Sequence, residues 1–434
     1  MTQLPDDTVS NSQDLSTHTP SLWDRKLPVI VVYFALLGLT MVAAYGLRQA
    51  GVPTLNDLGQ PLRAAQFISQ GELDRALFEP DSFAYTSPPA WPLMIAGVAA
   101  VTGQTLEWAN IWLGWLAWAA VLGAAAICAQ VCGIALRSLR GLVTFAAVAA
   151  SAGSAAALAE FWHPQDLAGT AGVLLGVAAA LRRRWWWAAL AFGAAIALRH
   201  PMALALLPVL FLVEGRRPRL TLLAGAIGVP LLVSWPFFLA DPGNFLAAMR
   251  ADVTLTIPIS PVGRLLLPLE DQTIAWSVGR IAPIAAALII TAVVWRLRLR
   301  LTPVAVLGAV GAVFASRLIF EPAPFVYYAA PAAVFAILAG PARGKWPFVG
   351  LAGVWVLSFA GGVDLRKLAA SDPSDGRLLV ATLCWTVGTA LLFVALGRWW
   401  RSPQVIDAPA GPDTHVASPL LECPPSGGEV TSAG

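Results

Sequence analysis

Charged side chains are scarce in this 434-residue sequence, in which Asp, Glu, Lys and Arg together make up only 12% of the residues. Soluble globular domains carry about 25% charged residues. The composition therefore excludes an ordinary water-soluble enzyme or binding domain. In place of charge the chain has 57% apolar residues and 18 tryptophans, which is typical of a protein whose solvent is largely lipid.

Sequence motifs for binding cytosolic nucleotides are also missing. The chain has neither the phosphate-binding G-x-x-x-x-G-K-[ST] loop nor a G-x-G-x-x-G motif that follows a strand. The small net charge of +3 is accounted for by arginines that mark membrane topology, so we predict no nucleic-acid partner.

Cysteine is rare as well, with four residues at positions 128, 132, 384 and 423. None of them falls in a segment predicted to face outside the cell, so the sequence implies no disulfide framework. Cys128 and Cys132 share a helical face but have no other ligand type near them. This spacing favours helix packing, and we predict no metal at these positions.

Long apolar runs are what the sequence has instead, and each is close to the roughly 20 residues that cross a hydrocarbon core. We predict an all-α integral membrane protein with about twelve transmembrane helices. The predicted spans are residues 28–47, 108–136, 142–159, 167–181, 185–198, 201–213, 220–239, 273–295, 303–318, 325–338, 346–361 and 378–396. A shorter run, 88–101, is predicted to lie at the external membrane surface. Gly172 and Gly176 have a spacing that lets helices approach closely.

Basic clusters alternate with segments of mixed charge along the chain. Since positive residues stay in the cytoplasm, the mixed segments are predicted external loops, at about 48–107, 160–166, 240–272, 319–324 and 362–377. Residues 1–24 and 402–434 are polar or rich in Pro, Gly and Ser, and we predict disordered cytoplasmic tails there. Between them, residues 25–401 form one multi-pass domain of the plasma membrane.

Several short segments occur in a characteristic order. The first span is followed by LNDLGQ, which contains Asp57, then by FAYTSPPAWPLMIAG and a long span that ends in arginines. The segments FWHPQDLAG, RRRWWWAALAFGAAIALRHP and SRLIFEPAPFVYYAAP follow later. This order resembles the GT-C superfamily of polytopic glycosyltransferases, and particularly bacterial members that transfer mannose or related sugars. The likeness extends over about residues 28–396 and depends on order and topology.

The resemblance implies that a hexosyl or pentosyl group moves, with inversion, from a polyprenyl-phosphate donor to a glycan, glycolipid or protein acceptor of the cell envelope. It also implies that an acid of the first external loop is the catalytic base, and Asp57 is the candidate. A carboxylate there can take the proton of the acceptor hydroxyl. Asp57 lacks the second acid found in some members, which argues against a divalent metal but leaves that alternative open; we assign no metal ligand and no other cofactor.

The leaving phosphate requires fixed positive charge, which arginine supplies best because its guanidinium binds two phosphate oxygens at once. Arg317 is the most informative, since an arginine inside an apolar helix costs roughly 2.5–3.5 kcal/mol on insertion scales. The candidates for binding the donor phosphate or the substrate are Arg63, Tyr85, His163, Asp166, Arg199, His200, Arg264 and Arg317.

Each assignment has a structural alternative. Asp57 could cap a short helix that begins near Gly59, and Glu72 or Asp74 could then be the base. His163 and Asp166 could satisfy helix ends, and Arg317 could pair with Glu321 one turn away. Tyr327 and Tyr328 could contact sugar or anchor the membrane interface. Two other functions stay open at this stage: a secondary transporter or lipid-linked sugar flippase, and an O-antigen ligase or polymerase.

The charge alternation generates a topological prediction that cysteine labelling can check. In a variant lacking the four native cysteines, single cysteines replacing Asp57, His163 or Glu270 should react with a membrane-impermeant thiol reagent in intact cells. Cysteines at Arg183 or Arg298 should react only after the membrane is opened, because basic clusters stay inside. Labelling of the Arg183→Cys variant in intact cells would overturn the proposed orientation.

Overall fold

The computed structural model describes residues 59–79, 83–149, 151, 162–250, 272–297, 301–320, 326–344 and 376–397. Within these ranges the chain is almost entirely helical. A helix is found in each predicted span that the structure describes, while the predicted spans 28–47 and 346–361 lie outside the described residues. The predictions for the two tails also lie outside them.

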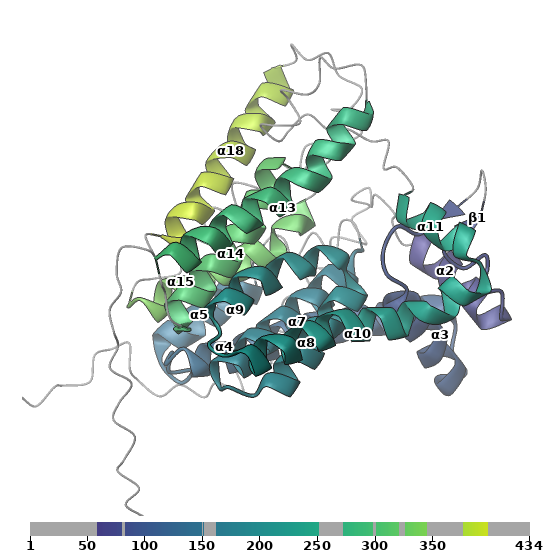
Figure 1. Ribbon diagram of the computed structural model, residues 1–434, viewed down its shortest axis with the longest axis horizontal. Coiled ribbons are helices and arrows are strands. Elements are labelled where there is room, and N and C mark those ends of the chain that lie inside the picture. The colour runs from purple at the N-terminus through teal and green to yellow at the C-terminus, as the bar shows by residue number, and fades with distance from the viewer. Residues whose placement is uncertain are drawn as a thin grey trace, which may run out of the picture.

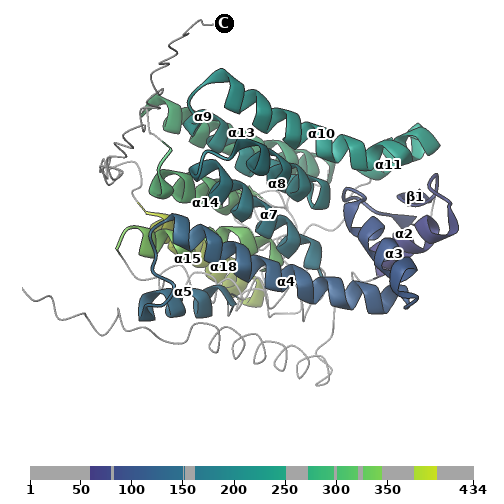
Figure 2. The ribbon, with the colours of Figure 1, turned by 90° about the horizontal axis from the view of Figure 1, so that it is seen from below.

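The long helices form a bundle in two groups (Figures 1 and 2). The first group comprises α4 (Leu106–Val131), α5 (Leu139–Ala149), α7 (Pro164–Leu181), α8 (Trp185–Leu198), α9 (Leu206–Leu212) and α10 (Arg216–Ala240). The second comprises α13 (Gln272–Arg296), α14 (Pro303–Phe320), α15 (Ala329–Ala342) and α18 (Gly376–Leu396). Helix α7 packs against α4 and α8, α8 packs against α10, and α14 packs against α13, α15 and α18. Buried residues of both groups share one continuous apolar core.

A small assembly of short elements, which we name the end cap, covers one end of the first group (Figures 1 and 2). It consists of α2 (Gly59–Gln70), the antiparallel strands β1 (Phe78–Glu79) and β2 (Phe83–Ala84), α3 (Ala90–Thr102) and α11 (Pro242–Arg250). Its apolar core includes Phe67, Leu77 and Phe237. The Asn244 side chain donates to the Asp74 carbonyl oxygen over 2.9 Å. Two segments far apart in sequence, both predicted to be external, therefore meet at the same end of the bundle.

Helix ends account for most differences between predicted and observed bounds. The span predicted to run to residue 136 ends at Val131, because Gly133 adopts a left-handed φ of 75° and the amide of Ile134 bonds back to the Ala129 carbonyl. Conversely, α7 starts three residues before its predicted start, with Pro164 in the first turn, where its missing N–H costs nothing. Helix α8 matches its predicted bounds, and α2 begins at Gly59, as expected.

Two predicted spans begin as tighter 3₁₀ turns. The segment predicted as 201–213 consists of η3 (His200–Ala205) followed by α9, and the start of the segment predicted as 325–338 is η4 (Val326–Tyr328) followed by α15. Prolines explain both, since Pro208 and Pro331 have no N–H to complete a regular helical bond. Arg199 directly precedes the first of these turns, and the second contains Tyr327 and Tyr328.

Glycines allow the closest helix contacts. A Cβ added at Gly172 would lie 2.8 Å from the Ala195 side chain, and one at Gly176 would lie 2.8 Å from the Phe192 ring. The close approach predicted from the spacing of these two glycines is confirmed, between α7 and α8. A tighter contact joins α8 to α10, where a Cβ on Gly225 would come within 2.6 Å of the Ala189 backbone. Backbone atoms cannot move aside as a flexible side chain can.

This contact generates a stability prediction for α10. Gly225→Ala should lower the stability of the detergent-purified protein by about 1–3 kcal/mol, because the methyl group forces α8 and α10 apart. Gly228→Ala is the matched control, since no atom lies within 4 Å of a Cβ at that position. The control should be neutral or stabilising by up to about 1 kcal/mol from helix propensity. Equal unfolding curves for the two variants would contradict the close packing.

Candidate functional site

A buried ion pair joins the start of α7 to the end of α8. Helices α7 and α8 form an antiparallel hairpin, so Asp166 in the first turn of α7 lies beside Arg199, which directly follows the last residue of α8. Arg199 donates from Nε to Asp166 Oδ1 over 3.0 Å, and the two side chains are 7% and 1% exposed. The His163 Nδ1 atom lies 3.4 Å from the other carboxylate oxygen. Asp166 therefore does not serve as a local helix cap.

Arg199 also binds the segment between β2 and α3. Its Nη1 atom donates to the hydroxyl of Ser87, which is 3% exposed. Two residues earlier, Tyr85 is buried at 2% exposure. Burial raises the pKa of Tyr85 well above its ordinary value, so its phenol keeps its proton and remains a hydrogen-bond donor. Arg199 thus ties the end cap to the helical bundle.

Aromatic rings form the other side of the cluster. The Tyr327 ring of η4 stacks on His163 with centroids 4.3 Å apart, and the Tyr328 ring meets Tyr327 edge-on at 4.6 Å. Both arginines lie against Tyr328: Arg317 Cζ is 4.2 Å from the ring centroid and Arg199 Cζ is 5.8 Å from it. Cation–π contacts of this kind are strongest where water is excluded.

Arg317 belongs to α14, a helix whose middle is buried on all sides. It is 9% exposed and lies in the last turn of the helix. The sequence predicted that such an arginine needs a partner or an aqueous cavity. The structure supplies the Tyr328 ring as one partner. The alternative pairing with Glu321 lies outside the described residues.

Several buried polar atoms around the cluster make no hydrogen bond to the described residues. They are the Tyr85 hydroxyl, the Gln165 Oε1 atom and the Trp162 indole nitrogen. Leaving such a group unsatisfied costs about 1–3 kcal/mol. Buried polar atoms of this kind are the ones that ordered water or a bound polar group can satisfy.

The structure brings together five of the predicted site residues: Tyr85, His163, Asp166, Arg199 and Arg317. His200 follows Arg199 directly but its side chain is exposed at the start of η3. Asp57 and Arg264 lie outside the described residues, so their roles stay predictions.

The remaining candidate, Arg63, lies in the end cap and not in the cluster. It pairs with Glu79 and lies over the Phe67 ring. Arg75 binds Glu72 and Glu79, so Glu72, a second choice for the base, belongs to an exposed network of ion pairs.

Two residues of the cluster were not predicted. Ser87 is the acceptor for Arg199, and the Gln165 Nε2 atom lies 2.8 Å from His163 Nδ1. Both occur in quoted segments, FAYTSPPAWPLMIAG and FWHPQDLAG, where a polar residue next to proline interrupts an apolar stretch. That local signal could have selected them, but it names no partner.

Metal ligands are not gathered in the part of the chain that the structure describes. No group of three or more His, Cys, Asp or Glu residues lies close enough together there to hold an ion. The carboxylate of Asp166 is engaged by Arg199 and His163. The cluster can instead hold negative charge through guanidinium groups and hold hydroxyl groups through phenol, amide and imidazole.

Helix lengths and composition define the class of protein. Among the described residues, five helices are long and apolar enough to cross a membrane: Leu106–Val131, Pro164–Leu181, Arg216–Ala240, Pro303–Phe320 and Leu379–Leu396. Further apolar helices are shorter. The chain is therefore a multi-pass, all-helical integral membrane protein.

Comparisons with known proteins yielded structural matches and no sequence match. No protein-family model and no curated protein matches the sequence. The chain is similar in structure to ArnT from Cupriavidus metallidurans bound to undecaprenyl phosphate, with a TM-score of 0.47 and 17% identity over 86% of this chain and 77% of ArnT. For ArnT in the apo state the TM-score is 0.43, with 15% identity over 85% and 77% of the respective chains.

The buried pair generates a double-mutant prediction. Asp166→Ala or Arg199→Ala should each destabilise the protein by about 3–5 kcal/mol, because each leaves the other charge buried without its partner. The double variant should lose clearly less than the sum of both. Denaturant unfolding in detergent measures all three, with Glu72→Ala as a control in an exposed ion pair that should change little. Additive losses would show that the two charges are not energetically coupled.

Proposed function

We propose that this protein is a glycosyltransferase that moves a sugar from a polyprenyl-phosphate donor to a cell-envelope acceptor at the external face of the membrane. One observation carries the proposal: Arg317 and the Asp166–Arg199 pair converge on the Tyr328 ring at the ends of apolar helices. A lipid-linked sugar phosphate presents the matching groups, since its phosphate is anionic and its sugar is rich in hydroxyls. The resemblance to the GT-C superfamily supports the same reaction.

The contacts favour different roles for the two arginines. Arg199 already donates hydrogen bonds from Nε to Asp166 and from Nη1 to Ser87, so two of its three guanidinium nitrogens are bound to protein groups. We assign it to positioning, because it fixes the segment with Ser87 and Tyr85 relative to α7. Arg317 is assigned to the donor phosphate, with its planar guanidinium held against Tyr328. A preorganised cation can stabilise the charge that develops on the leaving phosphate.

Asp57 is proposed as the base, two residues before the first residue of α2. Its carboxylate would accept the proton of the acceptor hydroxyl, whose oxygen forms a bond to the anomeric carbon. The bond between that carbon and the phosphate oxygen breaks, and the polyprenyl phosphate leaves with the electron pair. Attack from the face opposite the phosphate inverts the anomeric configuration.

A transporter or flippase is less well supported by the placement of charge. Such proteins concentrate charged residues and broken helices near the middle of the membrane. Here Asp166 is in the first turn of α7, Arg199 follows the last residue of α8, and Arg317 is in the last turn of α14. Charge at helix ends fits chemistry at a membrane face better than passage across it.

The donor role of Arg317 can be tested with Arg317→Lys, which keeps the charge but loses the two-pronged geometry. Losing one charge-assisted hydrogen bond is worth about 1.5–3 kcal/mol, so the KM for the lipid-linked donor should rise about 10- to 100-fold. The KM for the acceptor should change little. The matched control is Arg216→Lys, because Arg216 is an exposed arginine at the start of α10, and this variant should leave the donor KM unchanged. An unchanged donor KM in Arg317→Ala membranes would assign Arg317 to helix packing alone.

The decisive experiment offers membranes a panel of labelled polyprenyl-phosphate sugars and compares wild type with Asp57→Asn. Asn caps helices about as well as Asp but cannot accept the proton, so transfer should fall about 10²- to 10⁴-fold while protein amount and donor binding persist. Glu72→Gln is the control and should retain activity. If Asp57→Asn transfers sugar at the normal rate, Asp57 is only a cap, and the base lies at Glu72, Asp74 or in residues 241–271.

A further inference from the structure

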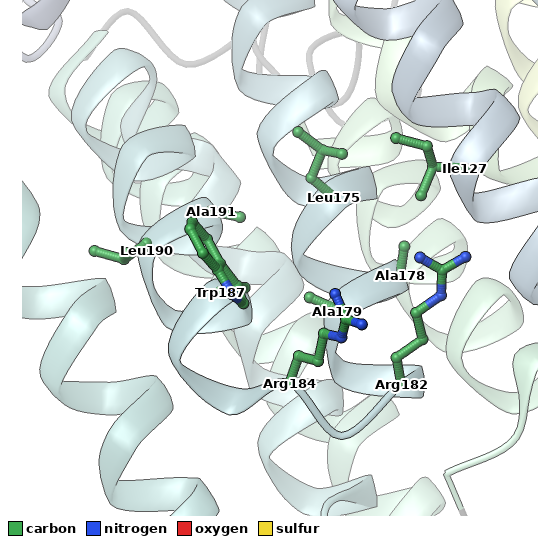
Figure 3. A pocket seen from close by; sticks show the side chains of 9 residues that line it. All are labelled: Ile127, Leu175, Ala178, Ala179, Arg182, Arg184, Trp187, Leu190 and Ala191. Atoms are coloured by element: carbon green, nitrogen blue, oxygen red, sulfur yellow. The ribbon is translucent and has the colours of Figure 1, made fainter.

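A groove begins at the turn between α7 and α8, and Figure 3 shows the side chains that line it. This turn is at the opposite end of the α7–α8 hairpin from the Asp166–Arg199 pair. The volume of the groove is about 410 Å³ and three helices line it. Ile127 of α4, Leu175 of α7 and Leu190 of α8 form apolar walls. Alanines, among them Ala178 and Ala191, leave the space between these larger side chains.

Two arginines close one end of the groove. Figure 3 shows the side chains of Arg182 and Arg184 rising from the turn between α7 and α8 along the groove. Both are exposed, and among the described residues neither has an ion-pair partner. Two adjacent guanidinium groups at the end of an apolar channel are complementary to an anionic headgroup that carries an acyl chain.

The turn that presents these arginines is built in an unusual way. Arg183 adopts a left-handed φ of 57°, and the amides of Arg183 and Arg184 bond back to the carbonyls of Ala180 and Ala179. This helix-ending motif normally has glycine at the left-handed position. The chain keeps a third arginine there, although a left-handed residue with a side chain costs about 1–2 kcal/mol. The turn thereby concentrates positive charge at this end.

The length of α7 places the groove at a membrane face. From Asp166 to Arg182 the helix rises about 24 Å at about 1.5 Å per residue, close to the roughly 30 Å of a hydrocarbon core. The arginines therefore lie near the face opposite the buried ion pair. Trp187 beside them is 66% exposed, as expected for a side chain at the lipid interface.

We propose that this groove binds an anionic glycerophospholipid, with Arg182 and Arg184 on its phosphate and one acyl chain along Ile127, Leu175 and Leu190. Anionic lipids give the cytoplasmic leaflet a negative surface potential, and basic pockets between membrane helices bind such headgroups. A polyprenyl phosphate fits less well, because the proposed transfer site lies at the other end of α7. The choice of a glycerophospholipid over a polyprenyl phosphate rests on the proposed function, whereas the groove and its two arginines do not.

Native mass spectrometry of the detergent-purified full-length protein tests this site. Phosphatidylglycerol should bind at least 5-fold more tightly than phosphatidylcholine with the same acyl chains, and added salt should weaken its binding. Arg182→Gln with Arg184→Gln should abolish this preference. Arg216→Gln with Arg217→Gln removes the same charge from an exposed neighbouring turn and should leave the preference intact.

A second variant keeps both arginines and fills the groove. Ala191→Leu should weaken binding of phosphatidylglycerol by obstructing the acyl chain, so the proposal can be judged even if the arginine variant is poorly folded. Equal binding of both lipids to wild type, or an unchanged preference after the arginine substitutions, would overturn the proposal. Preferential binding of undecaprenyl phosphate over phosphatidylglycerol would overturn it too, and would identify a carrier-lipid site instead.

Discussion

The buried pair of Asp166 and Arg199 is the constraint on which the arrangement of the site depends. An uncompensated charge cannot remain in an apolar bundle, so each member requires the other at a defined place. Because Arg199 also holds Ser87 and lies near Tyr328, this requirement aligns the hairpin, the end cap and the start of α15. A buried ion pair contributes little net stability compared with apolar replacements. Its retention is therefore better explained by positioning.

Small residues make that alignment possible. A Cβ on Gly169 would meet Met202 at 3.0 Å and the Arg199 Cβ at 3.5 Å, so the backbone of α7 approaches η3 closely beside the ion pair. Contacts at Gly172 and Gly176 continue the same approach along the hairpin. Helices in lipid gain little from the hydrophobic effect, and close packing of this kind is what holds them together. The α7–α8 hairpin thus has arginines at both of its ends, in two different environments.

At one end of the hairpin arginine is buried and paired, whereas at the other it is exposed. Arg199 is surrounded by a carboxylate, a hydroxyl and aromatic rings, which is a costly environment that only specific partners make tolerable. Arg182 and Arg184 follow the last turn of α7, where the membrane interface accommodates charge at little cost. The same residue type thus serves the positioning of a polar site in one place and contact with lipid in the other.

The sequence by itself determined that the chain is an integral membrane protein, and it located most of the helices. Hydropathy and the positions of glycine and proline are local properties, which is why both bounds of α8 could be predicted to the residue. For the same reason, Gly133 in the sequence already indicated that α4 ends before the predicted residue 136. The sequence also selected the residue types suited to a phosphate and a sugar. Only the tertiary structure decided which of them meet: Asp166 reaches Arg199 across 33 residues and Ser87 reaches it across 112. Such pairings depend on helix packing, and no local pattern encodes them, so Arg63 stood among the candidates with Arg317 until the fold placed it in the end cap.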